Sequence, residues 1–120
     1  MTLTGKWTGK LMDIKGFVGD LELALEHSGE RLEGRIAVRI MDEESQERFT
    51  VPLTGTVAGQ EVTLTYKESP QAPLNFVFQG RVADAMPHAR YAIYGTYKLE
   101  GESERSYLGG GCCLFWLYRK

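Results

Sequence analysis

Large apolar residues alternate with polar ones along most of the chain. Between Leu53 and Tyr66, apolar side chains alternate with threonines on both sides of a short Ala58-Gly59 segment. A period of two places successive side chains on opposite faces of a strand. The stretch therefore predicts two strands joined by a tight turn at Ala58-Gly59 or one residue later. With Ala58-Gly59 as the loop, Leu53 lies opposite Leu64, and the apolar groups share one face.

A short device recurs along the chain: a large apolar residue, any residue, glycine, any residue and a second large apolar residue. Five segments fit it: Leu3–Trp7, Leu32–Ile36, Leu53–Val57, Phe78–Val82 and Ile93–Tyr97. The period of two points each glycine toward the core. A glycine there buries no side chain and loses more backbone entropy on folding than other residues do. Such a glycine is explained by a sharp bend, or by a side chain from across the core that needs room. Five of them favour a closed or strongly coiled sheet.

The alternating stretches follow one another as sequential hairpins, and we count eight strands. A Ser28-Gly29 loop, for example, sets Leu25 opposite Leu32 and again closes the register on one apolar face. No stretch shows a helical period over ten or more residues. The sequence thus predicts an all-β fold in which residues 1–120 form a single-domain, eight-stranded, antiparallel up-and-down β-barrel.

The last stretch, Cys112 to Arg119, is apolar on both faces. We assign Trp116 to the inner face and Phe115 and Leu117 to the outer face. The outer pair would join Val77 and Tyr94, beside Ala92, in an exposed apolar patch. Such patches usually mark association, so we expect a homo-oligomer, a dimer or tetramer. The alternative is that the chain's own loops cover Phe115 and Leu117.

The interior of an eight-stranded barrel is either filled by side chains or holds one small ligand. We expect the ligand-binding interior to be lined by eight aromatic residues: Trp7, Phe49, Tyr66, Phe76, Phe78, Tyr91, Tyr97 and Trp116. Their polar groups are tyrosine hydroxyls and indole nitrogens, so a polar guest would leave groups unpaired at roughly 1–3 kcal/mol each. The first hypothesis is therefore an apolar or aromatic small-molecule binding protein. The second is a structural, protein-interaction or inhibitor barrel with a filled interior.

Composition narrows the partners and the location. The chain has a net charge of −2 and a pI of about 5.7, with no basic stripe, so we expect no nucleic-acid partner. No apolar run reaches transmembrane length and the N-terminus lacks a signal-peptide pattern, which predicts a cytoplasmic protein without a membrane partner.

The titratable residues give little indication of chemistry. Cys112 and Cys113 are adjacent and have no histidine nearby in sequence, so we expect no metal and no cofactor. His27 lies in a predicted turn. Asp84 and His88 flank Met86-Pro87 in a predicted connection and would form an acid–base pair at a barrel mouth if the protein were a small barrel isomerase or cyclase, which is the third and weakest hypothesis.

The Gly5-Lys6-Trp7 segment and the strand count together resemble the calycin barrels, which include lipocalins and avidins. Calycins carry Gly-x-Trp at the start of the first strand, and that Trp packs under an Arg or Lys from the end of the last strand. Arg119 is in the matching place, so the resemblance implies a barrel-closing contact between Trp7 and Arg119. A guanidinium over an indole is a cation–π contact of about 1 kcal/mol when partly exposed.

The chain also departs from these relatives. It stops at the eighth strand, where lipocalins add a helix, and its first loop is too short for the two helices of fatty-acid-binding barrels. Avidins match best in length, but their first loop supplies Asn and Ser groups to biotin, which Asp13–Gly16 lacks. Biotin binding is therefore not carried over.

Overall fold

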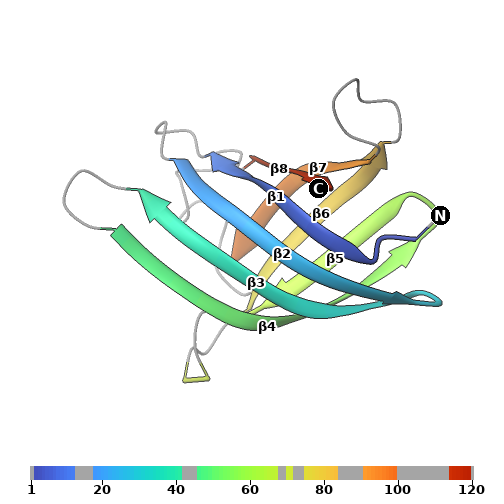
Figure 1. Ribbon diagram of the computed structural model, residues 1–120, viewed down its shortest axis with the longest axis horizontal. Coiled ribbons are helices and arrows are strands. Elements are labelled where there is room, and N and C mark those ends of the chain that lie inside the picture. The colour runs from blue at the N-terminus through green and yellow to red at the C-terminus, as the bar shows by residue number, and fades with distance from the viewer. Residues whose placement is uncertain are drawn as a thin grey trace.

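The computed structural model is a closed barrel of eight antiparallel strands, each paired with its neighbours in sequence order, which confirms the predicted fold (Figure 1). It describes residues 2–12, 18–41, 46–67, 70–71, 75–83, 91–99 and 114–119, and these contain no helix. The strands are β1 (Gly5–Met12), β2 (Val18–Ser28), β3 (Arg31–Met41), β4 (Gln46–Ala58), β5 (Glu61–Tyr66), β6 (Phe76–Ala83), β7 (Ala92–Leu99) and β8 (Leu114–Arg119).

The loops of two tight hairpins lie one residue later in the sequence than Ser28-Gly29 and Ala58-Gly59. Ala58 pairs with Glu61, so the second of these loops is Gly59-Gln60, and the other is likewise Gly29-Glu30. Both glycines have a φ of 63°, in the left-handed region that glycine adopts at least cost. A loop displaced by one residue moves the pairing by two, which is the period of a strand. The turn predicted at Ala58-Gly59 or one residue later is thus confirmed in its second form. The opposite residues expected for loops at Ala58-Gly59 and Ser28-Gly29 were wrong, but the inward faces were right.

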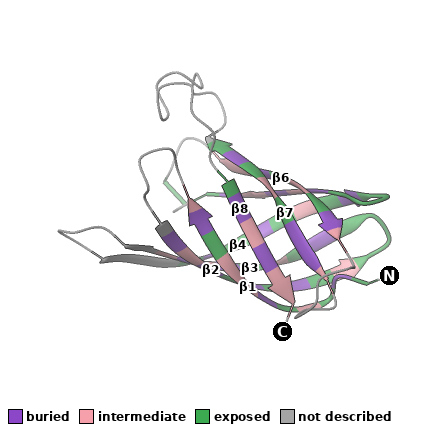
Figure 2. Ribbon diagram, turned by 90° about the horizontal axis from the view of Figure 1, so that it is seen from above, coloured by how far each residue is buried: buried purple, intermediate pink, exposed green. Residues whose placement is uncertain are grey.

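The inward faces of the strands form one hydrophobic core. Buried residues alternate with more exposed ones along the strands (Figure 2), and no polar or charged residue is buried within the described part of the chain. The largest fully buried side chains are Trp7, Phe78 and Phe115.

The eighth strand has the opposite orientation to the one we predicted. Phe115 and Leu117 are 2% and 0% exposed, whereas Leu114 is 39% exposed and Trp116 is only partly buried. Because both faces of this strand are apolar, its pattern does not distinguish inside from outside. The pairing decides: Phe115 lies opposite Leu11 of β1 on one side and Gly95 of β7 on the other, and both are inward positions.

The inward glycines of β6 and β7 make room for Phe115. Gly80 and Gly95 are partners in the ladder, and a Cβ built on Gly80 would lie 2.7 Å from the Tyr94 carbonyl oxygen and 2.8 Å from Cζ of Phe115. A Cβ on Gly95 would collide with the carbonyl oxygen of Gln79. At this place, the expectation that a core glycine accommodates a side chain from elsewhere in the barrel is confirmed.

The N-terminal cap, residues 2–4, closes the end of the barrel where β1 begins and β8 ends. Leu3 is fully buried in the core, its amide donates to Nδ1 of His27 (3.0 Å), and its carbonyl accepts from Nε1 of Trp7 (2.9 Å). The hydroxyl of Thr4 accepts from the amide of His27 (3.0 Å). His27 lies in strand β2 and not in the turn that we predicted, and it is therefore a structural anchor of the cap.

Arg119 fastens this cap from the last strand. Its Nη1 donates to the carbonyl of Thr2 (2.7 Å), while its guanidinium carbon lies 4.4 Å from the centre of the Tyr91 ring. Trp7 and Arg119 are partners in the β1–β8 ladder, so the first and last strands do meet where we expected. The ring under the guanidinium is nevertheless Tyr91 and not Trp7. Tyr91 accepts a backbone hydrogen bond from Arg119 (3.2 Å), and the Trp7 indole is buried in the core.

The packing at Gly80 predicts that Gly80→Ala will lower the free energy of unfolding by about 1–3 kcal/mol, as overpacking of a filled core does. Urea denaturation measures the change. Gln79→Ala, at the exposed neighbouring position, is the control and should stay within about 0.5 kcal/mol of the parent. Adding Phe115→Leu to Gly80→Ala should recover part of the loss, and a Gly80→Ala protein as stable as the parent would contradict the close approach.

The cap predicts different outcomes for two substitutions of His27. His27→Ala removes the acceptor of the Leu3 amide and should cost about 1–3 kcal/mol, because that amide is left partly buried without a partner. His27→Asn places an amide oxygen near the position of Nδ1 and should retain most of the stability. Hydrogen exchange at the Leu3 amide should accelerate in the Ala variant and not in the Asn variant, and equal exchange in both would argue against this anchor.

Candidate functional site

Four of the eight residues predicted to line the interior form one aromatic cluster. The Tyr66 ring stacks on Phe76 with centroids 5.4 Å apart, and it meets the edge of Phe78 at 5.5 Å. Tyr97 lies 5.3 Å from Phe78. Phe115, which we had expected outside, completes the cluster at 4.8 Å from Phe78. Such ring pairs add about 0.5–1.5 kcal/mol each beyond the area that they bury.

The aromatic cluster lies at the distal end of the barrel, opposite the N-terminal cap. Strand β5 ends at Tyr66, β6 begins at Phe76, and Tyr97 is near the end of β7. The ladder places Tyr66 opposite Phe76, and Phe78 opposite Tyr97. Three neighbouring strands therefore bring these four side chains to one place.

Burial within the cluster decreases toward the distal end. Phe78 is fully buried, and Tyr66 and Tyr97 are nearly so, but Phe76 at the start of β6 is only partly buried where it packs on the core. The capped end differs, because Leu3, Ile93 and Leu117 there are completely buried. Phe76 is thus the most exposed member of the cluster.

The remaining predicted interior residues lie elsewhere. Trp7 and Tyr91 belong to the capped end, and Trp116 is on the outer wall. The side chain of Phe49 lies outside the described residues. The one signal in the sequence for Phe115 was the apolar character of both faces of its strand, which left its orientation open.

The predicted association patch is not assembled as expected. Phe115 and Leu117 are in the core, Val77 is partly buried, and Tyr94 alone of the four is largely exposed, at 51%. The large apolar residues on the outside of β8 are instead Leu114, Trp116 and Tyr118.

The distal end offers apolar contact and no acid–base chemistry among the described residues. No buried charge or buried polar side chain accompanies the aromatic cluster, and no three metal-binding side chains gather in the described ranges. The proposed pair Asp84 and His88, and both cysteines, lie outside the described residues. The arrangement therefore suits a guest held by its apolar surface.

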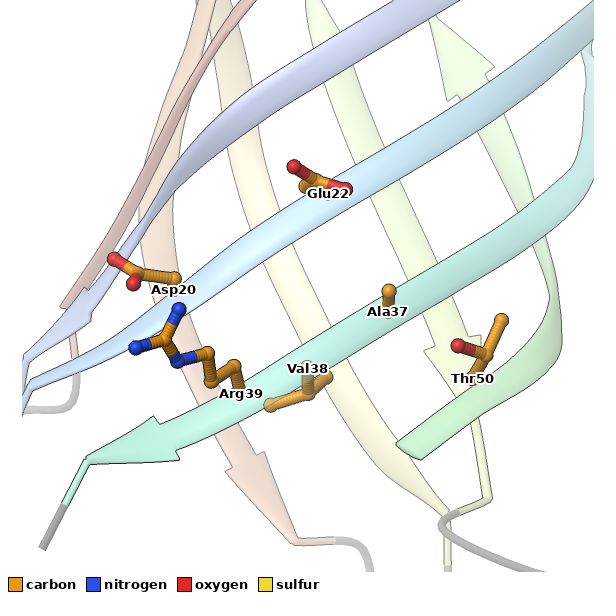
Figure 3. A pocket seen from close by; sticks show the side chains of 6 residues that line it. All are labelled: Asp20, Glu22, Ala37, Val38, Arg39 and Thr50. Atoms are coloured by element: carbon orange, nitrogen blue, oxygen red, sulfur yellow. The ribbon is translucent and has the colours of Figure 1, made fainter. Parts of the chain in front are cut away.

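The outer wall also carries hollows. One of ≈ 400 Å³ is lined by Asp20, Glu22, Ala37, Val38, Arg39 and Thr50 (Figure 3). Nε of Arg39 is buried there without a hydrogen-bond partner, whereas Asp20 pairs with Lys10 at 2.6 Å. Since two carboxylates and a guanidinium share this space, it selects neither an anion nor a cation, and we do not assign it a ligand.

Comparison of the chain with protein-family models, with curated proteins and with solved structures finds no match. The resemblance to calycins therefore extends as far as the closed, sequential eight-stranded barrel, and no family is identified for this chain.

The described residues include no helix that could span a membrane.

Proposed function

We propose that the protein binds a small apolar or aromatic molecule at the distal end of its barrel, against the aromatic cluster. The observation that carries this proposal is Phe76. It is stacked on Tyr66 at the rim of an otherwise buried aromatic group, and part of its surface remains exposed.

The direction of entry follows from the two ends of the barrel. Hydrogen bonds link the cap to His27, which accepts, and to Trp7 and Arg119, which donate. A guest entering at this end would have to break them. At the distal end, the partly exposed ring of Phe76 is the contact that the described residues offer to a guest. Covering a further 100 Å² or so of apolar surface there would contribute about 2.5 kcal/mol before the cost of association.

The chemical class of the guest follows from the lining. The cluster itself consists of aromatic rings whose polar groups are the hydroxyls of Tyr66 and Tyr97. A strongly polar guest would therefore lose hydrogen bonds to water at roughly 1–3 kcal/mol per unpaired group. A flat aromatic guest would add a ring contact to Phe76.

Titration with N-phenyl-1-naphthylamine, a neutral aromatic fluorophore, tests the proposal. We expect saturable binding of one molecule per barrel, weakened about tenfold or more by Phe76→Ala, since most of the ring contact is lost. Lys98→Ala, at an exposed position on β7, is the matched control and should bind as the parent does. Native mass spectrometry of the purified protein should also show a copurifying apolar molecule.

A filled interior is the second candidate, and the seating of Phe115 over Gly80 favours it, because that ring occupies space that a guest would need. The barrel would then be a structural or protein-interaction module. Absence of saturable fluorophore binding together with absence of a copurifying molecule would reject the ligand proposal and leave this one. Binding that is equally strong in the Phe76→Ala protein would reject the distal site.

A further inference from the structure

A second hollow lies on the outer wall over β5, β6 and β7. Its volume is ≈ 410 Å³ and its side chains combine five polar groups with one aromatic ring: Glu61, Thr63, Gln79, Arg81, Thr96 and Tyr94. It lies outside the barrel and is separate from the aromatic cluster, so a ligand held in it would be independent of the proposed function.

Gly80 and Gly95, which are partners in the β6–β7 ladder, form part of the floor of this hollow, and the ring of Phe115 comes close behind Gly80. Positions that face the core present only backbone to the outer wall. The floor is therefore backbone, and the outward side chains of the flanking positions form a polar rim around it.

Tyr94 forms the aromatic side of the hollow and is 51% exposed. It pairs across the ladder with Trp116 of β8 on one side and with Arg81 of β6 on the other. Leu114, next to Trp116 on the same face, is 39% exposed. An exposed ring thus lies between an apolar strip on β8 and hydrogen-bonding side chains on β5 and β6.

We propose that this hollow binds a neutral carbohydrate, with one sugar ring lying on Tyr94. A sugar ring has apolar C–H faces, which an aromatic face covers, and a periphery of hydroxyls that both donate and accept hydrogen bonds. The rim supplies both kinds of partner: Glu61 accepts, Arg81 donates, and Gln79 does both.

Other occupants fit the hollow less well. Single-stranded nucleic acid uses aromatic stacking with a basic groove, but here the carboxylate of Glu61 is the ladder partner of Arg81 and the chain has a net charge of −2. A purely apolar molecule would leave the polar rim unpaired. A stable dimer buries about 800 Å² on each partner, and two exposed apolar side chains, Tyr94 and Leu114, supply only a small part of that.

The open shape of the wall suits an internal stretch of an extended chain rather than a single enclosed sugar. Glu61 and Arg81 are ladder partners of opposite charge, so the rim favours neither an acidic nor a basic sugar. The probes are therefore three neutral β-linked hexasaccharides: cellohexaose, laminarihexaose and chitohexaose.

Isothermal titration and ¹H–¹⁵N NMR of the full chain test the proposal. We expect at least one of the three hexasaccharides to bind saturably at about 1 mM or below, with the largest shifts on β5, β6 and β7. Tyr94→Ala should weaken binding at least tenfold, whereas Tyr94→Phe, which keeps the ring, should bind nearly as the parent does. Glu61→Gln should weaken binding several-fold, and thermal unfolding should show that all three variants remain folded.

Three results would overturn the proposal. The first is that none of the hexasaccharides binds, and the second is that Tyr94→Ala binds like the parent. The third is that the wall has a different occupant, shown by tighter binding of oligo(dT) or by a dimer in light scattering that Tyr94→Ala dissociates. None of these results bears on N-phenyl-1-naphthylamine binding at the distal end, so the two proposals fail independently.

Discussion

The structure depends on the ladder between the first and last strands. Six residue pairs join β1 to β8, from Trp7 with Arg119 to Met12 with Leu114. The two strands approach so closely that a Cβ on Gly9 would collide with the carbonyl oxygen of Trp116. A sheet that failed to close there would expose two unpaired edges and the apolar lining behind them. The inward glycines, the cap and the orientation of Phe115 all serve this closure.

Much of this fold follows from local pattern, and the errors have physical causes. A period of two identifies the inward faces of strands such as Leu21–Leu25, whose outer positions are polar. It fails for β8, where both faces are apolar and only pairing with β1 fixes the orientation of Phe115 and Leu117. The cation–π partner of Arg119 was also predicted wrongly. It is Tyr91, which precedes β7, the other neighbour of β8, and no motif near Trp7 indicates this.

The candidate site shows a second limit of sequence reasoning. Alternation predicts that Tyr66, Phe76, Phe78 and Tyr97 point inward, but not how far along the barrel axis each one lies. The same alternation predicts that Trp7 and Tyr91 point inward, and yet both belong to the opposite, capped end of the barrel. The outer hollow has no sequence signature either, since its rim of Glu61, Gln79 and Arg81 resembles any solvated strand face.

The hydrogen bond between Arg119 and Thr2 spans 117 positions along the chain, and this separation has a consequence for folding kinetics. Contacts between distant segments form slowly, because the entropy of closing a long loop must be overcome before they contribute. The local hairpins can assemble early, but the barrel cannot close until β8 pairs with β1 and β7. During that interval the first strand and β7 remain edges on which another nascent chain can add. Docking of β8 therefore removes both of the edges on which aggregation could begin.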